Sequence, residues 1–217
     1  MSDLIFVVPV KDVRGAKQRL ASLLPQEIRS ELAVLLLDQT LRDLARFAPE
    51  VDRLLVSDSE GMRMVADAHR AAFLLETAGA GETTAVERAT AWTLARGYRA
   101  QAVIPADMAE LVAADVRALV EAPRPAPSVI LCPAVGDDGT NAILSSPPDA
   151  VGYRFGDRSF DAYRARAAAN GVACRVMRLQ SFVLDIDTPD DARAFIATRP
   201  DNPIARWLTT HLHLAAS

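Results

Sequence analysis

The chain has 217 residues, of which 50% are hydrophobic and 24% charged, with a net charge of −4. This composition predicts a globular protein of one domain, residues 1–217, with enough apolar residues for a full core. The negative charge argues against a general nucleic-acid or membrane-surface binder, and no apolar run reaches the ~20 residues that span a bilayer. Two cysteines without CxxC spacing, Cys132 and Cys174, are typical of free thiols in the cytoplasm.

The first expected element is a near-continuous apolar run with β-branched residues, Leu4–Val10. Such a run indicates a strand buried on both faces, as in a parallel sheet. It is short and lacks a basic leader, so it does not resemble a signal peptide. Residues 11–19 follow with one glycine and four cations: Lys11, Arg14, Lys17 and Arg19.

Helical and strand patterns then alternate as far as residue 133. An amphipathic helix opened by Pro25 runs to about Phe47, and further helices are expected at 60–70, from the 79–84 loop to Arg96, and at 113–121. Strands are expected at 53–57, 72–75, 102–104 and 129–133. Alternation of this kind predicts an α/β fold with a parallel sheet.

The pattern changes after residue 133. Short strands are expected at 141–144, 174–179 and 183–185, and helices at 160–170, 189–198 and 204–214. Gly171 closes the first of these helices at its C′ position. The back half should therefore add mixed or antiparallel members to the sheet. The last helix could pack on the sheet or on a partner subunit in a homodimer.

The stretch from Phe182 to Asp191 is the most informative part of the chain. Its apolar run ends in Asp185 and Asp187, which point the same way if the segment is a strand. Two like charges on one side need a compensating partner, and a divalent cation such as Mg²⁺ would supply it. Thr188 then reads as a helix N-cap. The alternative is that Asp187 and Asp190 only cap and charge that helix.

Polar residues gather where the predicted strands end. Cations follow the first strand, while carboxylates follow three others, at Asp58, Asp107 and Asp185. Ligands of open α/β sheets bind beyond the carboxyl ends of the strands. A triphosphate with a magnesium ion would satisfy both sets, because amines and guanidiniums hold phosphate and carboxylates hold the metal.

Other chemistries lack their motifs. The sequence contains neither a Walker A motif nor GxGxxG, and it shows no nucleophile elbow or Cys/His pair. The three histidines, His69, His211 and His213, have no ligand spacing. Trp92 and Trp207 are expected to be core or interface anchors rather than stacking platforms.

Six further segments stand out, in this order along the chain: Pro9–Lys11, Ala16–Leu20, Pro105–Asp107, Gly139–Ala142, Phe155–Phe160 and Leu184–Asp191. Together, and in this order, they resemble the 2-phospho-L-lactate guanylyltransferase family of coenzyme F-420 biosynthesis. The resemblance implies a nucleotidyltransferase with a glycosyltransferase-A-like fold, a three-layer sandwich around a mixed, mostly parallel sheet. It also implies that a small phosphorylated acid attacks the α-phosphorus of GTP and that pyrophosphate leaves.

The resemblance further implies roles for individual residues. The catalytic set is Lys17, Asp107, Asp185 and Asp187, and the three aspartates match the Mg²⁺ positions. The phosphorylated acid would be held by Thr140, Asn141, Gly156, Arg158 and Ser159, with Arg154 a further candidate for its carboxylate. The nucleotide would be held by Lys11, Lys17, Arg19, Gly81 and Thr83.

The sequence departs from the family pattern at three places. Gly81-Glu82-Thr83 stands where Gly-Leu-Asn is usual, Ala109 where a proline is expected, and Tyr163 where a histidine is common. These changes bear on guanine preference and on the acid, for which phosphoenolpyruvate, 3-phospho-D-glycerate and 2-phospho-L-lactate stay open. A downstream deazaflavin transferase would use the product.

Two other functions stay open beside this one. A nucleotidyltransferase for a sugar phosphate or molybdopterin usually opens with a glycine-rich loop, where this chain has Pro9–Lys11. A non-catalytic nucleotide-binding protein would be expected to lose one or more of the metal carboxylates, and all three are present.

Overall fold

The computed structural model describes residues 2–77, 79, 81–134, 139–156, 158–182 and 185–215. Its centre is a seven-stranded sheet in the order β3-β2-β1-β4-β6-β5-β7. The strands are β1 (Leu4–Val10), β2 (Asp52–Ser57), β3 (Ala72–Leu75), β4 (Ala100–Val103), β5 (Ser128–Pro133), β6 (Thr140–Ser146) and β7 (Ala173–Val176). Among these strands only β6 runs antiparallel to its neighbours, so the sheet is mixed and mostly parallel as expected.

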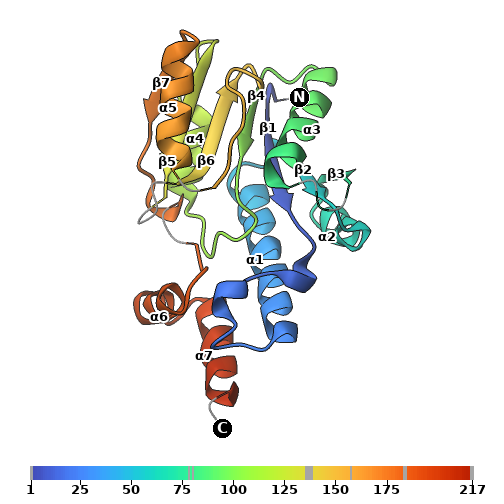
Figure 1. Ribbon diagram of the computed structural model, residues 1–217, viewed down its shortest axis with the longest axis vertical. Helices are drawn as coiled ribbons and strands as arrows, with labels where there is room; N and C mark the ends of the chain where they lie inside the picture. Colours follow the sequence, from blue (N-terminus) through green and yellow to red (C-terminus); the bar gives the residue numbers. More distant parts are fainter. Residues whose placement is uncertain are drawn as a thin grey trace.

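Helices cover both faces of the sheet and make it the middle of three layers (Figure 1). Even-numbered residues of β1, such as Phe6, pack with α1 (Gln26–Phe47), α2 (Arg63–Ala68) and α4 (Ala113–Glu121). Odd-numbered residues, such as Ile5, pack with α3 (Glu82–Ala95) and α5 (Ser159–Ala169). This division follows from the alternation of side chains along a strand, and it explains why the apolar run of β1 is nearly continuous.

A third apolar cluster lies below the sheet, between the first half of α1, α6 (Pro189–Thr198) and α7 (Pro203–Ala215) (Figure 1). Leu32 and Leu36 of α1 meet Phe195 of α6 and Leu208 of α7 there, all of them fully or almost fully buried. The last helix therefore packs within the chain. No helix among the described residues is both long and apolar enough to cross a bilayer.

Most expected elements are present, with differences at their ends. The helix expected at 60–70 begins as a 3₁₀ turn, Glu60–Met62, and ends at Ala68, two residues before Arg70 takes a left-handed φ of 52°. The strand expected at 102–104 starts earlier, at Ala100, because its backbone N–H already pairs with the carbonyl of Asp3.

The strand expected at 174–179 spans only Ala173–Val176. Met177 N still donates to Leu131 O of β5, after which the chain leaves the sheet for a 3₁₀ turn at Gln180–Phe182. Of the strand expected at 183–185, residues 183 and 184 lie outside the described residues. Asp185 itself forms an isolated antiparallel bridge with Met108.

Candidate active site

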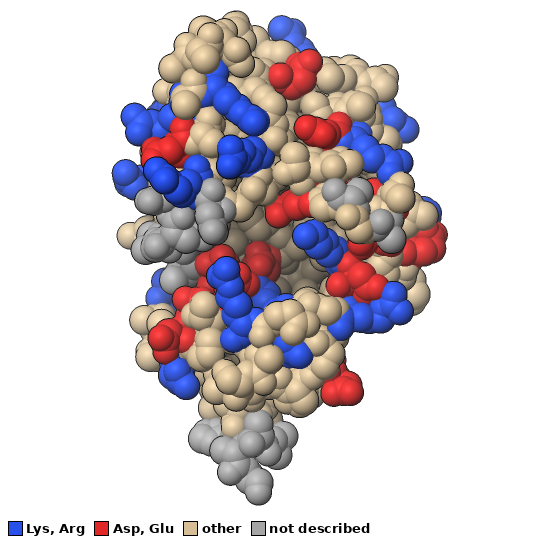
Figure 2. All heavy atoms as spheres, viewed as in Figure 1, with Lys and Arg blue, Asp and Glu red and all other residues tan. Residues whose placement is uncertain are grey.

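A cleft of about 450 Å³ opens at the carboxyl ends of β1 and β4, where the sheet architecture predicts a ligand site. Its volume falls in the range of small-molecule sites. Figure 2 shows this face hollowed near its centre, with acidic and basic side chains around the hollow. The charged residues that line the cleft are Lys11, Asp12, Lys17, Glu76, Glu82, Asp107 and Asp187.

Lys17 lies at the centre of the charged groups. Its Nζ donates to Asp107 Oδ2 at 2.6 Å and to Asp187 Oδ1 at 2.8 Å, and only 6% of its side chain is exposed. Burial disfavours the charged ammonium, but the two carboxylates outweigh burial and raise the pKa of Lys17. The residue also has a left-handed backbone, with φ of 53°, which is uncommon outside glycine. Lys17 is therefore a fixed, fully charged cation.

Asp185 is the third member of the predicted acidic set and lies close to the other two. Burial, followed by repulsion from Asp107 and Asp187, raises the pKa of Asp185 to about 6. Ile186, between the two aspartates of this segment, is fully buried in the cluster below the sheet. Asp107 and Asp187 thus meet at Lys17, and Asp185 lies close enough for its charge to interact with all three groups.

The donor set suits a magnesium ion. No group of three His, Cys, Asp or Glu side chains in the described ranges is arranged to hold a metal by itself. Mg²⁺ seldom needs such a cage, because it binds through one or two carboxylates together with water and substrate phosphates. Hard carboxylate oxygens with an excess of negative charge around Lys17 meet that requirement.

Helix α1 holds two of the loops that carry these groups. The guanidinium of Arg29, which is 6% exposed, donates to Lys17 O at 3.4 Å and to Gln18 Oε1 at 2.9 Å. Thr40 Oγ1 lies 3.3 Å from the carbonyl oxygens of Ala106 and Met108, on either side of Asp107. Arg29 and Thr40 were not predicted from the sequence as positioning residues. A buried arginine and threonine on the apolar side of an amphipathic helix were the available signal.

Two further contacts hold the segment that leads to Asp185. Asp115 Oδ2, in the first turn of α4, accepts from Ser181 N at 2.7 Å and Ser181 Oγ at 2.8 Å. Asn141 Nδ2 donates to Phe182 O at 2.8 Å, and Asn141 is 8% exposed. In this structure Asn141, expected to bind the acid, donates an amide hydrogen to the backbone of the neighbouring segment.

At the start of α6, the residues that cap the helix are not the residue that contacts Lys17. Thr188 accepts from Asp191 N, and Asp191 Oδ2 accepts from Thr188 N, which completes a capping box. The alternative reading, in which Asp187 and Asp190 cap this helix, is therefore wrong for the cap itself. Asp187 keeps its carboxylate for Lys17.

The other expected nucleotide residues lie around the cleft. Lys11 is exposed and lines it, while Arg19 is 69% exposed and reaches Asp187 Oδ2 only at 3.9 Å. Gly81, with φ of 85°, is the N-cap of α3. Thr83 Oγ1 accepts from Phe155 N at 3.5 Å, so this side chain joins α3 to the loop before α5.

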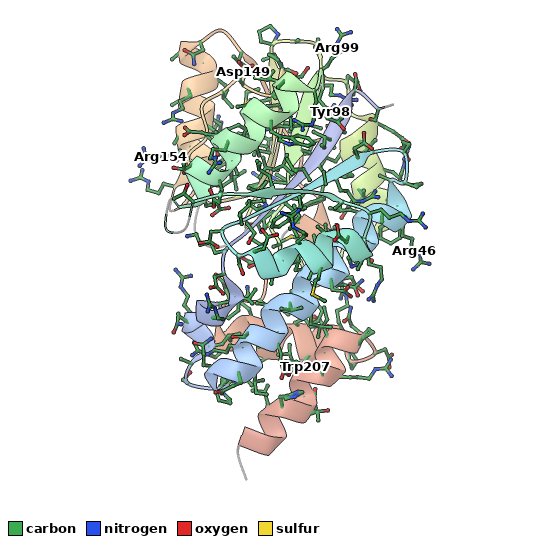
Figure 3. The ribbon with its side chains drawn as sticks, turned by 90° about the vertical axis from the view of Figure 1, so that its right-hand side faces the viewer. Arg46, Tyr98, Arg99, Asp149, Arg154 and Trp207 are labelled. Atoms are coloured by element: carbon green, nitrogen blue, oxygen red, sulfur yellow. The ribbon has the colours of Figure 1, made fainter. Side chains whose placement is uncertain are left out.

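The residues expected to bind the acid lie outside the walls of this cleft, on β6 and at the start of α5. Thr140 Oγ1 is buried without a hydrogen-bond partner among the described residues, and Ser159 is 2% exposed. Gly156 has φ of 104°, which a side chain would strain. Arg158 is exposed, and Figure 3 shows Arg154 extending away from the body of the molecule. Asp157 of the same motif lies outside the described residues.

Comparison with known proteins gives one consistent family. The family described as guanylyl transferase CofC like matches residues 4–207. The chain is 39% identical to 3-phospho-D-glycerate guanylyltransferase of Colwellia psychrerythraea, over 85% of this chain and 87% of that protein. It is 34% identical to phosphoenolpyruvate guanylyltransferase of Sphaerobacter thermophilus, over 90% and 94%.

Solved structures support the fold. A protein from Desulfovibrio desulfuricans G20, provisionally assigned as a nucleotide-diphospho-sugar transferase, has a TM-score of 0.77 at 16% identity over 100% of this chain and 98% of its own. A nucleotidyl transferase from Methanothermobacter thermautotroptrophicus has a TM-score of 0.64 at 14% identity, over 95% and 98%. At these low identities the similarity shows the fold alone, and this fold is the architecture expected from the sequence.

Proposed function

The chain belongs to the guanylyl transferase CofC-like family, and from this premise we propose that it joins the GMP moiety of GTP to a small phosphorylated three-carbon acid. Pyrophosphate is released, and the product enters the biosynthesis of the deazaflavin coenzyme F-420. Phosphoenolpyruvate and 3-phospho-D-glycerate are the acids in the names of the most similar relatives reported above, and 2-phospho-L-lactate is the third candidate. We take 3-phospho-D-glycerate first, because its name belongs to the relative at 39% identity.

The observation that carries the proposal is the placement of Lys17 between Asp107 and Asp187 at the wall of the cleft. A metal–triphosphate needs a cation for its phosphate oxygens and carboxylates for its metal within a few ångströms of each other. Lys17 and the aspartates supply both. In the proposal Asp107, Asp185 and Asp187 hold Mg²⁺, which when bound neutralises charge on the reacting phosphates.

The proposed reaction requires little covalent chemistry from the side chains of the protein. An oxygen of the acid's phosphate forms a bond to the α-phosphorus of GTP, and the bond from that phosphorus to the bridging oxygen breaks. Pyrophosphate departs with the electron pair. The attacking phosphate is already an anion, so no general base is required, and catalysis is placement and charge stabilisation. Lys11, Lys17 and Arg19 hold the triphosphate, while Gly81 and Thr83 border the nucleoside.

The acid lies toward α5 in this proposal. Thr140 offers a buried hydroxyl without a partner among the described residues, and the first turn of α5 begins at Ser159 with N–H groups that favour an anion. Gly156 allows the backbone a close approach. Arg158 and Arg154 are cations for the acid's carboxylate, and Asn141 contributes by holding the segment before Asp185.

The test is a substrate panel. The protein is incubated with Mg²⁺, each of the four nucleoside triphosphates and each of the three acids, with a sugar phosphate as a further acceptor, and pyrophosphate is measured. A downstream deazaflavin transferase is added to consume an unstable or inhibitory product. We expect release only with GTP and one of the three acids. Release with the sugar phosphate, or none even with the coupling enzyme present, would contradict the proposal.

A further inference from the structure

Glu76 lines the active-site cleft and has a carboxylate that none of the roles above uses. The residue is 8% exposed, and its Oε2 is buried with no hydrogen-bond partner among the described residues. Leaving a charged acceptor buried and unpaired costs free energy. A buried, unpartnered oxygen at the wall of a ligand cleft therefore points to a ligand that donates to it.

The backbone of Glu76 is held in place independently of any ligand. Glu76 N donates to Ser57 O at 2.9 Å, which continues the pairing of β2 with β3 one residue past the end of β3. The side chain therefore starts from a rigid point at the carboxyl edge of the sheet. Such a site suits recognition, because little conformational entropy is lost when a ligand binds.

The sheet order sets Glu76 apart from the aspartates. Glu76 follows β3 and Asp107 follows β4, and these strands stand three positions apart in the order β3-β2-β1-β4. At the usual strand spacing this is a separation of about 14 Å. A distance of that order matches an extended nucleotide with its phosphates at Asp107 and its base at Glu76.

We propose that Glu76 reads the guanine base, its two carboxylate oxygens accepting from N1–H and from the 2-amino group. This inference rests on the proposed function and names its specificity-determining residue. Guanine presents two adjacent donors on that edge, which match the two acceptors of an ionised carboxylate. Adenine presents a ring nitrogen acceptor and a C–H on the same edge, and neither cytosine nor uracil presents two adjacent donors.

Glu82, between Gly81 and Thr83, is the other glutamate of the cleft, and it differs from Glu76 in the charges that reach it. It lies in the first turn of α3, where burial and then the charge of Asp107 raise its pKa. For Glu76, burial and the charge of Asp58 raise the pKa, while Arg88 and Lys11 lower it. The position of Glu76 beyond β3, three strands from β4 and Asp107, favours the base.

The test measures nucleotide binding without turnover, by titration calorimetry with α,β-methylene analogues of GTP, ITP and ATP and no acid present. ITP differs from GTP only by lacking the 2-amino group. A charge-assisted hydrogen bond predicts that the wild-type protein binds the GTP analogue about 10- to 100-fold more tightly than the ITP analogue. Glu76→Gln keeps the size of the side chain and should bring that ratio close to 1. Glu87→Gln, the same change on the exposed side of α3, should leave the ratio unchanged.

The outcomes separate the two proposals. If the wild-type protein binds the ITP analogue as tightly as the GTP analogue, or if Glu76→Gln keeps the wild-type ratio, Glu76 does not recognise the 2-amino group. In either case, a preference for the GTP analogue over the ATP analogue would still support guanylyl transfer. If ATP binds as well as GTP, both proposals fail. The wild-type comparison of GTP with ITP needs no variant, so the inference stays testable even if Glu76→Gln does not fold.

Discussion

At the scale of single residues, the ammonium of Lys17 neutralises the mutual repulsion of Asp107 and Asp187 in the free protein. In the proposed reaction the same ammonium also binds the phosphates of GTP. The left-handed backbone at Lys17 is a local cost that the contacts of its side chain and of Arg29 offset.

Lys17→Ala should weaken GTP binding and destabilise the free protein. We expect the Michaelis constant for GTP to rise about tenfold or more, through loss of a charge-assisted contact to phosphate. The free energy of unfolding should fall by an amount between the ~1 kcal/mol of an exposed ion pair and the ~3 kcal/mol of a buried one. Steady-state kinetics and urea unfolding measure the two effects. If only the Michaelis constant for the acid changed, the basic loop would be assigned to acid binding instead of GTP binding.

Asp185→Asn should separate catalysis from folding. Turnover should drop by ~10²-fold or more, because the metal-based stabilisation of charge is lost. The fold should be kept, because an amide of the same shape removes a carboxylate that burial and two neighbouring carboxylates disfavour. Turnover at saturating Mg²⁺ and thermal unfolding are the measurements. Near-normal turnover in this variant would remove Asp185 from the mechanism.

The raised pKa of Asp185 predicts a pH dependence of stability. Because the folded chain holds this proton up to about pH 6 and the unfolded chain releases it near the ordinary value, the contribution of Asp185 to stability falls as pH rises through this window. Without metal, the wild-type protein should therefore lose stability relative to Asp185→Asn as the pH rises from about 4, the ordinary pKa, to about 6, the raised pKa of Asp185. Urea unfolding of both variants measures the difference, in which the other carboxyl groups cancel. A constant difference would contradict the assignment.

At the scale of elements, α1 is the scaffold of the site. Arg29 holds the loop of Lys17, Thr40 contacts the carbonyls beside Asp107, and Asp43 Oδ2 accepts from Leu111 N at 3.2 Å. One rigid helix thus sets the relative position of two loops that are 90 residues apart at Lys17 and Asp107. Sites on rigid elements hold their geometry better than sites on loops alone.

Arg29→Lys tests this scaffold. The change keeps the positive charge and loses the planar fork that contacts Lys17 O, Gln18 and Gln26. We expect kcat to fall about tenfold, since small misplacement of a catalytic group is costly. The matched control is Arg42→Lys on the exposed side of α1, where the ion pair with Asp38 should contribute little. Equal effects of the two changes would argue against a positioning role.

The pattern of elements was largely predictable, and its errors have local reasons. The apolar run of β1 and the amphipathic repeat of α1 are strong periodic signals, and both elements begin and end within a residue of the expected bounds. The strand expected at 174–179 was too long by three residues at its end. Apolar residues at this end pack against the hydrophobic core without continuing the strand. Periodicity reports burial and does not distinguish a strand from a buried loop.

At the scale of the whole molecule, the cluster below the sheet couples the C-terminal helices to the site. Ile186 is fully buried there with Leu208 of α7 and Phe195 of α6, and it stands between Asp185 and Asp187. Packing of the last two helices therefore helps to decide where two of the acidic side chains lie.

Leu208→Ala should show this coupling. A buried leucine shortened to alanine costs about 3 kcal/mol of unfolding free energy, measured by urea unfolding. Because the cavity opens in the cluster that holds Ile186, we also expect the Mg²⁺ concentration for half-maximal turnover to rise about threefold or more at a temperature where the variant is fully folded. Thr210→Ala, on the exposed side of α7, is the control. A destabilised variant with unchanged Mg²⁺ dependence would uncouple the cluster from the site.

The sequence by itself determined the alternation of strands and helices, the family likeness and the residue types of the site, because these depend on periodicity and on short motifs read along the chain. Lys17, Asp107, Asp185 and Asp187 could all be named in this way. Only the tertiary structure decided that Lys17 lies between two of the aspartates and that Arg29 and Thr40 hold the loops. It alone also showed that Glu76 Oε2 is buried without a hydrogen-bond partner among the described residues. Such contacts join residues far apart in sequence, and their partners are set by how the layers pack, which no local pattern contains.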